Sequence, residues 1–393
     1  LGPRQLGLYA LYRLGLESGH YRRSLPAGGN IAFQTAGAIH PILSTLPGPE
    51  SLLACMAGEL ARAAIQEAEE ITSGRVRLFG STPVPLELAP PGSLKHWTVY
   101  ELGQTPWGVE DVKLIWEPAR FGWAFRLSRA YRLTGEERYV QAFWAALEAF
   151  TAANPPNLGP NWASAQEVAL RLIALAFAGH VFAGAQASTP ARRQRLAETI
   201  SAHAARIPPP LVYARSQHNN HLISEAAGLL TAAACLPEHP QAGQWQAAGW
   251  RWLNEGFQAQ FTSGGAYAQH SANYHRLMLQ TAMWACKVGL RGACDFTPAV
   301  LERLAAATRW LLARIDPATG RCLNLGSNDG AYILPLAGGG VAAETAAEAL
   351  AAVVRRHRRH AGDGEALLRE RALIEVVAVA PVRVGHDRAA ANL

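Results

Sequence analysis

The stretch "RSQHNNHLISEAAGLL" (residues 215–230) places two imidazoles, two adjacent asparagines and a carboxylate at the start of an apolar helix. On a continuous helix, His218, His221 and Glu225 would share one stripe, and Asn220 would lie on the next. Imidazoles transfer protons, and amide N–H groups stabilise a developing negative charge. Two interpretations stay open for these residues alone: a capped helix with a satisfied buried histidine, or a polar first turn that faces a cleft.

A second stretch of the same form, "GGAYAQHSANYHRLML", occupies residues 264–279. It combines Tyr267 and Tyr274 with His270, His275 and Arg276. A phenol can act as a base when nearby cations lower its pKa from about 10, and the two histidines or the arginine could do so. Taken singly, each tyrosine is typical of a core aromatic residue with a tethered hydroxyl. As neighbouring helix starts, the two stretches are expected to face each other across one cleft.

Polar and aromatic residues also gather in "KLIWEPAR" and "NWASAQEVALRL". They are Trp116, Glu117, Arg120, Asn161, Trp162, Glu167 and Arg171. The i,i+4 spacing of Glu167 and Arg171 predicts by default a structural salt bridge. An exposed tryptophan at a helix start is a usual platform for a sugar face. The chain has no HExxH motif and no Cys/His cluster, so no metal site and no cofactor are predicted.

Helices must position these residues, because apolar side chains recur at helical spacing almost throughout from about residue 50. The predicted helices run near 52–72, 118–133, 137–153, 163–183, 190–205, 219–234, 241–259, 273–289 and 298–314. Residues 75–117 and the segment "RIPPPLVYAR" are expected to be non-helical. Paired helices predict a mainly α fold, an incomplete α/α toroid of stacked hairpins. Its cleft would be lined by loop-to-helix junctions.

Composition describes a globular chain of 393 residues, 49% hydrophobic and 17% charged. A net charge of +6 fits an acidic partner. We expect no nucleic-acid partner, because no compact basic stripe or binding motif precedes the tail. No apolar run is long enough to predict a transmembrane segment, and no signal peptide is visible. The five cysteines form no disulfide framework, and the oligomeric state is not predicted.

Five motifs in order resemble the heparinase II/III-like polysaccharide lyases: "KLIWEPAR", "NWASAQEVALRL", "NNHLISEAAGL", "YAQHSANYHRLML" and "NLGSNDGAYILPL". The opening "LGPRQLGLYALYRL" is similar too, so the resemblance covers residues 1–336. It implies an α/α toroid followed by an antiparallel β-sandwich, and cleavage of acidic polysaccharides such as heparan sulfate or alginate. It also implies a periplasmic or extracellular location.

The resemblance assigns Asn220, with His221 beside it, to charge neutralisation, and Tyr274, 54 residues after Asn220, to catalysis. The substrate-binding residues expected with them are Trp116, Glu117, Arg120, Asn161, Trp162, Glu167, Arg171, His218, Glu225, Tyr267, His270 and Arg276. In β-elimination, removal of the C5 proton of a uronate adds charge next to a carboxylate. Hydrogen-bond donors must neutralise that charge, and a phenol or imidazole can then protonate the departing O4 oxygen.

The end of the chain departs from this pattern. We expect the toroid to span residues 1–323 and the β-sandwich to begin at 324–336. Residues 337–393 contain no Phe, Trp or Tyr and are rich in Ala and Arg. They predict at most a remnant of the sandwich, truncated or frameshifted. The family's catalytic histidine from that domain has no counterpart that can be assigned here.

Two other functions compete with a lyase. A glycoside hydrolase on a similar toroid would use two carboxylates among Glu117, Glu167, Glu225 and Asp329, about 5–9.5 Å apart. Pairing of these acids in sequence with Arg or His favours structural roles for them instead. A non-catalytic glycan-binding fragment is the third hypothesis.

Overall fold

α-Helices form most of the protein in the computed structural model, which describes residues 2–28, 38–43, 46, 48–55, 58–80, 82–288, 295–316, 322 and 325–327. In chain order they are α1 (Pro3–Glu17), α2 (His20–Ser24), α3 (Pro49–Cys55), α4 (Gly58–Thr72), α5 (Trp97–Glu101), α6 (Lys113–Ala119), α7 (Ala124–Thr134), α8 (Glu137–Ala153), α9 (Ala165–Val181), α10 (Pro190–Arg206), α11 (Leu211–Gln217), α12 (Asn220–Cys235), α13 (Ala242–Gln260), α14 (Ala272–Val288) and α15 (Pro298–Leu312). The antiparallel strands β1 (Arg75–Arg77) and β2 (Pro83–Pro85) flank α4.

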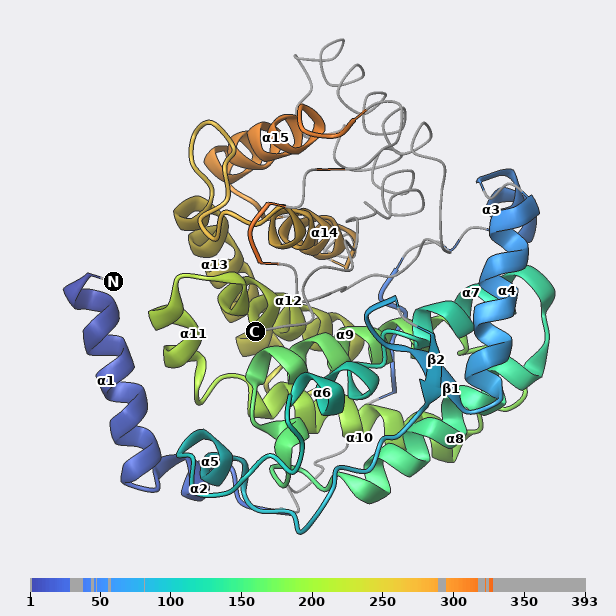
Figure 1. The fold of residues 1–393 in the computed structure, drawn as a ribbon, viewed down its shortest axis with the longest axis horizontal. Helices are drawn as coiled ribbons and strands as arrows, with labels where there is room; N and C mark the ends of the chain where they lie inside the picture. The colour runs from blue at the N-terminus through green and yellow to red at the C-terminus, as the bar shows by residue number, and fades with distance from the viewer. Residues whose placement is uncertain are drawn as a thin grey trace.

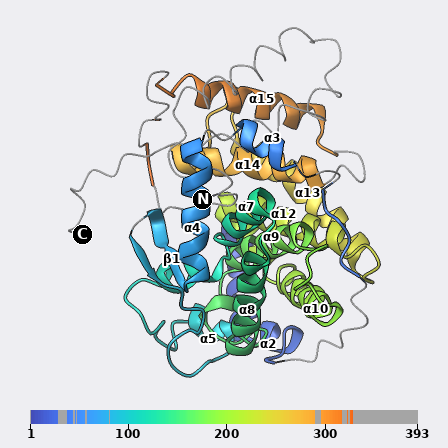
Figure 2. The same ribbon diagram turned by 90° about the vertical axis from the view of Figure 1, so that its right-hand side faces the viewer.

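Successive hairpins α7/α8, α9/α10, α12/α13 and α14/α15 pack side by side into an arc (Figure 1). Helix α9 packs against α7, α10 and α12, and α12 in turn packs against α13 and α14. Helices α9 and α12 therefore lie inside, with α10 and α13 outside them (Figure 2). This arrangement confirms the predicted mainly α fold and incomplete α/α toroid.

The inner helices α9 and α12 are buried on nearly all sides, which explains their continuous apolar sequences. Their close contact depends on Gly228 of α12. A Cβ atom at this position would lie 2.8 Å from Cβ of Ala169 in α9. The two backbones can approach this closely only because position 228 has no side chain.

Two segments differ from the prediction. "RIPPPLVYAR" was expected to be non-helical, but α11 begins at Leu211, directly after the last proline. Prolines before a helix are compatible with it, because the first helical N–H groups need no intrahelical acceptor. The region 75–117 was also expected to lack helix, yet it contains α5 and the start of α6. The predicted sandwich start at 324–336, apart from residues 325–327, and the tail at 337–393 lie outside the described residues.

Candidate active site

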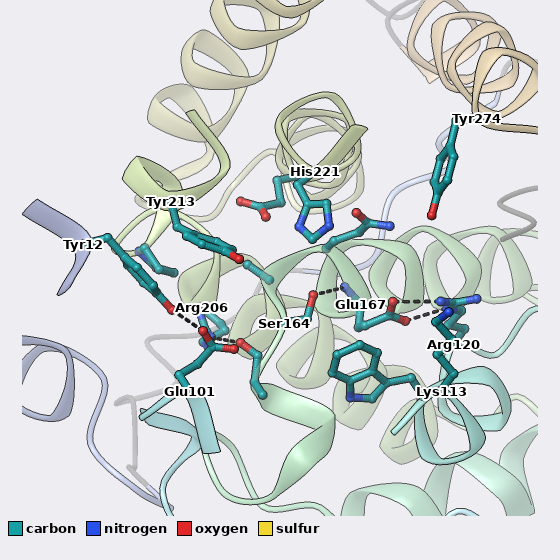
Figure 3. Close-up of a pocket in the computed structure, with 16 residues that line it drawn as sticks. Tyr12, Glu101, Lys113, Arg120, Ser164, Glu167, Arg206, Tyr213, His221 and Tyr274 are labelled. Atoms are coloured by element: carbon teal, nitrogen blue, oxygen red, sulfur yellow. Dashed lines mark hydrogen bonds and ion pairs between the residues drawn. The ribbon is translucent and has the colours of Figure 1, made fainter. Parts of the chain in front are cut away.

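A cavity of about 250 Å³ lies inside the arc, where the first turns of α9, α12 and α14 approach α6, α1 and α11 (Figure 3). Sixteen residues line it: Tyr12, Glu101, Lys113, Trp116, Arg120, Ala163, Ser164, Ala165, Gln166, Glu167, Arg206, Pro210, Tyr213, His221, Glu225 and Tyr274. They come from eight helices, from the residue that follows α6, and from the loops before α9 and α11. Loop-to-helix junctions thus contribute much of the wall.

A buried ion pair fixes one end of the cavity. Arg120 of α6 donates to both carboxylate oxygens of Glu167 in α9, at 2.6 and 2.9 Å, and also contacts Glu117. The indole N–H of Trp116 donates to the carbonyl oxygen of Pro160 at 2.9 Å. A bidentate guanidinium–carboxylate pair has a defined geometry. It holds α6 against the start of α9 and leaves the two charges largely offset.

Lys113, one turn before Trp116, brings a further positive charge to the same end (Figure 3). Its side chain has no hydrogen-bond or ion-pair partner within the part of the chain that the structure describes. The ammonium group is therefore available to an anionic ligand in the cavity.

The first turn of α9 places an amide on the cavity wall. Ser164 caps this helix by accepting from the backbone N–H of Glu167. Oε1 of Gln166 accepts from Nδ2 of Asn220 at 2.9 Å. Asn220 is buried behind Gln166 and does not line the cavity. The Gln166 amide therefore keeps a donor for the cavity, with Asn220 fixing its orientation.

The first turn of α12 begins at a sharp change of backbone direction. His218 has a left-handed conformation (φ 50°) and is exposed, so it ends α11 and does not share a stripe with His221. Asn219 then caps α12 by accepting from the backbone N–H of His221 at 3.1 Å. The imidazole of His221 points into the middle of the cavity (Figure 3).

Tyr274, in the first turn of α14, directs its hydroxyl into the cavity at the same end as Arg120 and Glu167 and points toward them (Figure 3). The turn is anchored by Ser271, whose Oγ accepts from the backbone N–H of Tyr274 and donates to the carbonyl of Ser327 at 2.6 Å. The phenol and the imidazole of His221 thus face one space, as expected of the two stretches.

Aromatic and charged residues form the other end. The hydroxyl of Tyr12 donates to Glu101 at 2.7 Å, and the ring of Tyr12 lies 4.5 Å from that of Tyr213. Burial is the main cause that raises the pKa of both phenols. Burial also raises the pKa of Glu225 to about 8, against the lowering effect of Arg206. At pH 7 this carboxyl group is therefore mostly protonated.

Three predicted binding residues support the fold instead of lining the cavity. Arg171 is fully buried, donates to the carbonyls of Ala119 and Asn161, and covers the ring of Phe150. The expected Glu167–Arg171 salt bridge is wrong, because Glu167 pairs with Arg120. Asn161 donates to Asn154. Trp162 is buried beside His203, so the expectation of an exposed sugar platform is wrong for Trp162.

The remaining predicted residues of the second stretch also lie away from the cavity. Tyr267 is buried, and its single hydroxyl hydrogen is shared between Oε1 of Gln260 and Oε1 of Gln269. Gln269 also accepts from the backbone N–H of Asn220. Buried Arg276 donates to Asn273 and Gln280, and exposed His270 does not line the cavity.

His275 is also unsuited to the role expected for it. Burial lowers the pKa of its imidazole to about 4, so it is neutral near pH 7 and supplies no positive charge to Tyr274. Glu117, which contacts Arg120, is likewise outside the cavity wall, and Asp329 lies outside the described residues.

The residues that sequence reasoning missed are of two kinds. Lys113 and Gln166 lie within quoted motifs, so their polar types were a usable signal. Tyr12, Glu101, Arg206 and Tyr213 come from four helices that meet only in the folded chain. No local spacing could have grouped them.

The described residues contain no group of three or more His, Cys, Asp or Glu side chains arranged to hold a metal ion. None of their helices has both the length and the apolar character to span a membrane.

Known proteins resemble this chain over its helical part. The family model for the heparinase II/III N-terminus matches residues 95–302. A heparin-sulfate lyase of Bacteroides thetaiotaomicron is 29% identical over 159 residues, which are 40% of this chain and 22% of that protein. A heparin-sulfate lyase of Bacteroides stercoris is 24% identical over 189 residues, which are 43% of this chain and 28% of that protein.

Solved structures share the fold. A crystal structure of heparinase III matches with a TM-score of 0.52 and 19% identity, over 83% of this chain and 47% of that one. The heparan sulfate lyase HepC from Pedobacter heparinus matches with a TM-score of 0.52 and 16% identity, over 92% of this chain and 50% of that one. This chain thus spans about half the length of these solved chains, and a smaller share of the length of the two curated relatives. At these identities the structures show the helical toroid alone.

Proposed function

This chain belongs to the heparinase II/III family, and from that premise we propose that it is a polysaccharide lyase that cleaves a uronate-containing acidic polymer by β-elimination. The relatives named as heparin-sulfate lyases support a glycosaminoglycan as the first polymer to test. The observation that carries the proposal is the convergence of Tyr274, His221 and a partnerless Lys113 on one cavity.

The cavity offers the groups that elimination requires. Tyr274, in its phenolate form, takes the C5 proton of the uronate, the C5–H electron pair forms the C4–C5 double bond, and the C4–O4 bond breaks with its electron pair leaving on O4. The phenol, or His221, returns a proton to O4. Charge that develops on the substrate carboxylate needs donors aimed at it, and the Gln166 amide held by Asn220 is placed for this role. In this arrangement Asn220 acts through Gln166.

The charges around the cavity suit an anionic polymer. Arg120 is paired with both Glu167 and Glu117, so Lys113 is the cation at this end of the cavity that forms no ion pair within the described residues. An ammonium group beside the reacting sugar attracts a carboxylate or sulfate. A polymer of this kind would be met in the periplasm or outside the cell, which is where we propose that the protein acts.

A glycoside hydrolase is the second candidate, and the state of Glu225 favours it. A protonated carboxyl group on a cavity wall can serve as a general acid, with Glu101 as the second carboxylate. Glu117 and Glu167 are less suitable, because each is held by Arg120.

Ultraviolet absorbance during incubation with heparan sulfate, alginate, hyaluronan and pectin distinguishes these functions. Elimination leaves an absorbing unsaturated uronate, whereas hydrolysis produces new reducing ends without absorbance. The proposal predicts both signals to rise together on at least one polymer. New reducing ends alone would establish a hydrolase. Binding without either signal would leave a non-catalytic glycan-binding protein.

A further inference from the structure

Two buried ionisable side chains at the end of the cavity away from Tyr274 each have one atom without a hydrogen-bond partner. Arg206 donates through Nε and Nη2 to the carbonyls of Trp162 and Ala163, at 3.0 and 2.7 Å, while its Nη1 has no acceptor. Oε2 of Glu225 has no donor either, among the residues that the structure describes. Each side chain is only 1% exposed, and both line the cavity.

An ion pair between Arg206 and Glu225 would satisfy both atoms, but it is not formed. No Arg206 nitrogen lies within 4.0 Å of a Glu225 oxygen, although each group affects the pKa of the other. Unpaired buried polar atoms are rare in native proteins, because burial without a hydrogen bond is costly. A polar ligand group between the two would remove this cost.

The surroundings of the two groups select the kind of ligand. Glu101 accepts from Tyr12 and offsets the charge of Arg206 electrostatically, and Tyr213 is the other phenol that lines this end. Burial keeps Glu225 mostly protonated at pH 7. This end therefore has little net charge, it has no ammonium group such as that of Lys113 among its lining residues, and it combines N–H and O–H donors with carboxyl acceptors.

We propose that the Arg206–Glu225 end is a subsite for an uncharged, hydroxyl-bearing sugar ring, one hydroxyl of which bridges Nη1 of Arg206 and the carboxyl group of Glu225. A hydroxyl group both donates and accepts, so it satisfies both atoms at once. A sulfate or carboxylate would add a second negative charge beside Glu101, which already offsets the charge of Arg206. The inference rests on the proposed function only in taking the ligand to be a polysaccharide.

Direct binding tests the subsite without any turnover. Full-length Tyr274→Phe protein is titrated calorimetrically with an unsulfated tetrasaccharide of alternating glucuronate and N-acetylglucosamine, alone and combined with Glu225→Gln or Glu225→Leu. The amide of Glu225→Gln keeps a neutral hydrogen-bonding group, so we expect affinity within threefold at pH 7. Glu225→Leu should lose at least tenfold. Exposed Glu255→Gln is the control and should change nothing.

The pH dependence of the affinity is a second test, and it does not require the leucine variant to fold. Between pH 7 and pH 9, affinity should fall with Glu225 intact, because the ionised carboxylate attracts Arg206 and competes with the sugar hydroxyl for it, and it should stay level in Glu225→Gln. The subsite is overturned if Glu225→Leu binds as tightly as its parent, if Glu225→Gln loses affinity tenfold at pH 7, or if the parent does not bind. Failure of the proposed function looks different, because binding would keep this pattern while no polymer yields an unsaturated product.

Discussion

Glu225 links the stability of the fold to pH at the scale of one residue. Its pKa is about 8 in the folded protein and near its ordinary value of 4.5 when unfolded. Below pH 4.5 both states hold the proton. Between pH 4.5 and pH 8 only the folded state holds the proton. Ionisation of Glu225 then lowers the free energy of the unfolded state alone, so the free energy of unfolding falls by about 1.4 kcal/mol per pH unit.

We predict that urea unfolding of Glu225→Gln shows a shallower loss of stability between pH 6.5 and 8 than the parent protein does. The difference between the two proteins cancels the contribution of His203 and His275. Their pKa values are lowered to about 3 and 4, so these histidines reduce stability only as the pH falls below about 6.5. Parallel stability curves would show that Glu225 is ionised in the folded protein.

Arg120 is a second residue whose removal has a defined consequence. Arg120→Met leaves the Glu167 carboxylate buried without its bidentate partner, so we predict a loss of about 3–5 kcal/mol in the free energy of unfolding. Adding Glu167→Met should recover much of that loss. Arg251→Met breaks an exposed i,i+4 pair and should change stability by about 0.5 kcal/mol or less. Equal losses from the two arginine variants would argue against a buried pair.

At this scale the sequence predicted residue types better than positions. His221 and Tyr274 lie on one cavity, as their place at two helix starts indicated. Asn220 does not reach the cavity, because Gln166 from helix α9 lies between Asn220 and the cavity and accepts its hydrogen bond. Which of two polar neighbours reaches a cavity depends on tertiary packing, and a single sequence carries no signal for that.

Helix α12 shows at the scale of elements how packing constrains the chain. Gly228→Ala brings a methyl group within 2.8 Å of the Ala169 side chain and 3.1 Å of its Cα, so α9 and α12 must separate. We predict a destabilisation of about 1–3 kcal/mol. Gly7→Ala in α1 meets nothing within 4 Å and should stabilise by about 0.5–1 kcal/mol. Chemical denaturation of both variants checks this, and a stabilising Gly228→Ala would contradict the close contact.

Long helices were predictable and short ones were not. The ranges near 137–153 and 190–205 correspond to α8 and α10 because their periodic apolar pattern continues for four turns or more. Helices α5, α6 and α11 have only five to seven residues, too few for a periodic pattern to stand out beside prolines. All three contribute to the cavity, so the least predictable elements matter most for the site.

The whole molecule combines a net charge of +6 with a cavity that contains the ammonium group of Lys113. We predict that affinity for an acidic polysaccharide falls as the salt concentration rises, because both contributions are screened. Lys113→Met should weaken binding and make the salt dependence shallower, while the stability of the fold changes little. Titration of the polymer at several sodium chloride concentrations measures this. Affinity that is independent of salt would contradict an electrostatic role.

The fold as a whole could be predicted from the pairing of helices, because each helical hairpin has an apolar face that it buries by stacking on its neighbours in an arc. The expected sandwich start lies almost entirely, and the tail wholly, outside the described residues.

The most direct test of a phenol-driven elimination compares Tyr274→Phe with Tyr267→Phe in the ultraviolet assay, on whichever polymer yields product. Tyr274 faces the cavity. Tyr267, seven residues earlier in the chain, is buried, and its hydroxyl contacts Gln260 and Gln269. The account predicts that Tyr274→Phe lowers turnover by about 100-fold or more with binding retained. Tyr267→Phe should keep turnover within a few fold. Product formation by Tyr274→Phe at the parent rate would contradict the central claim.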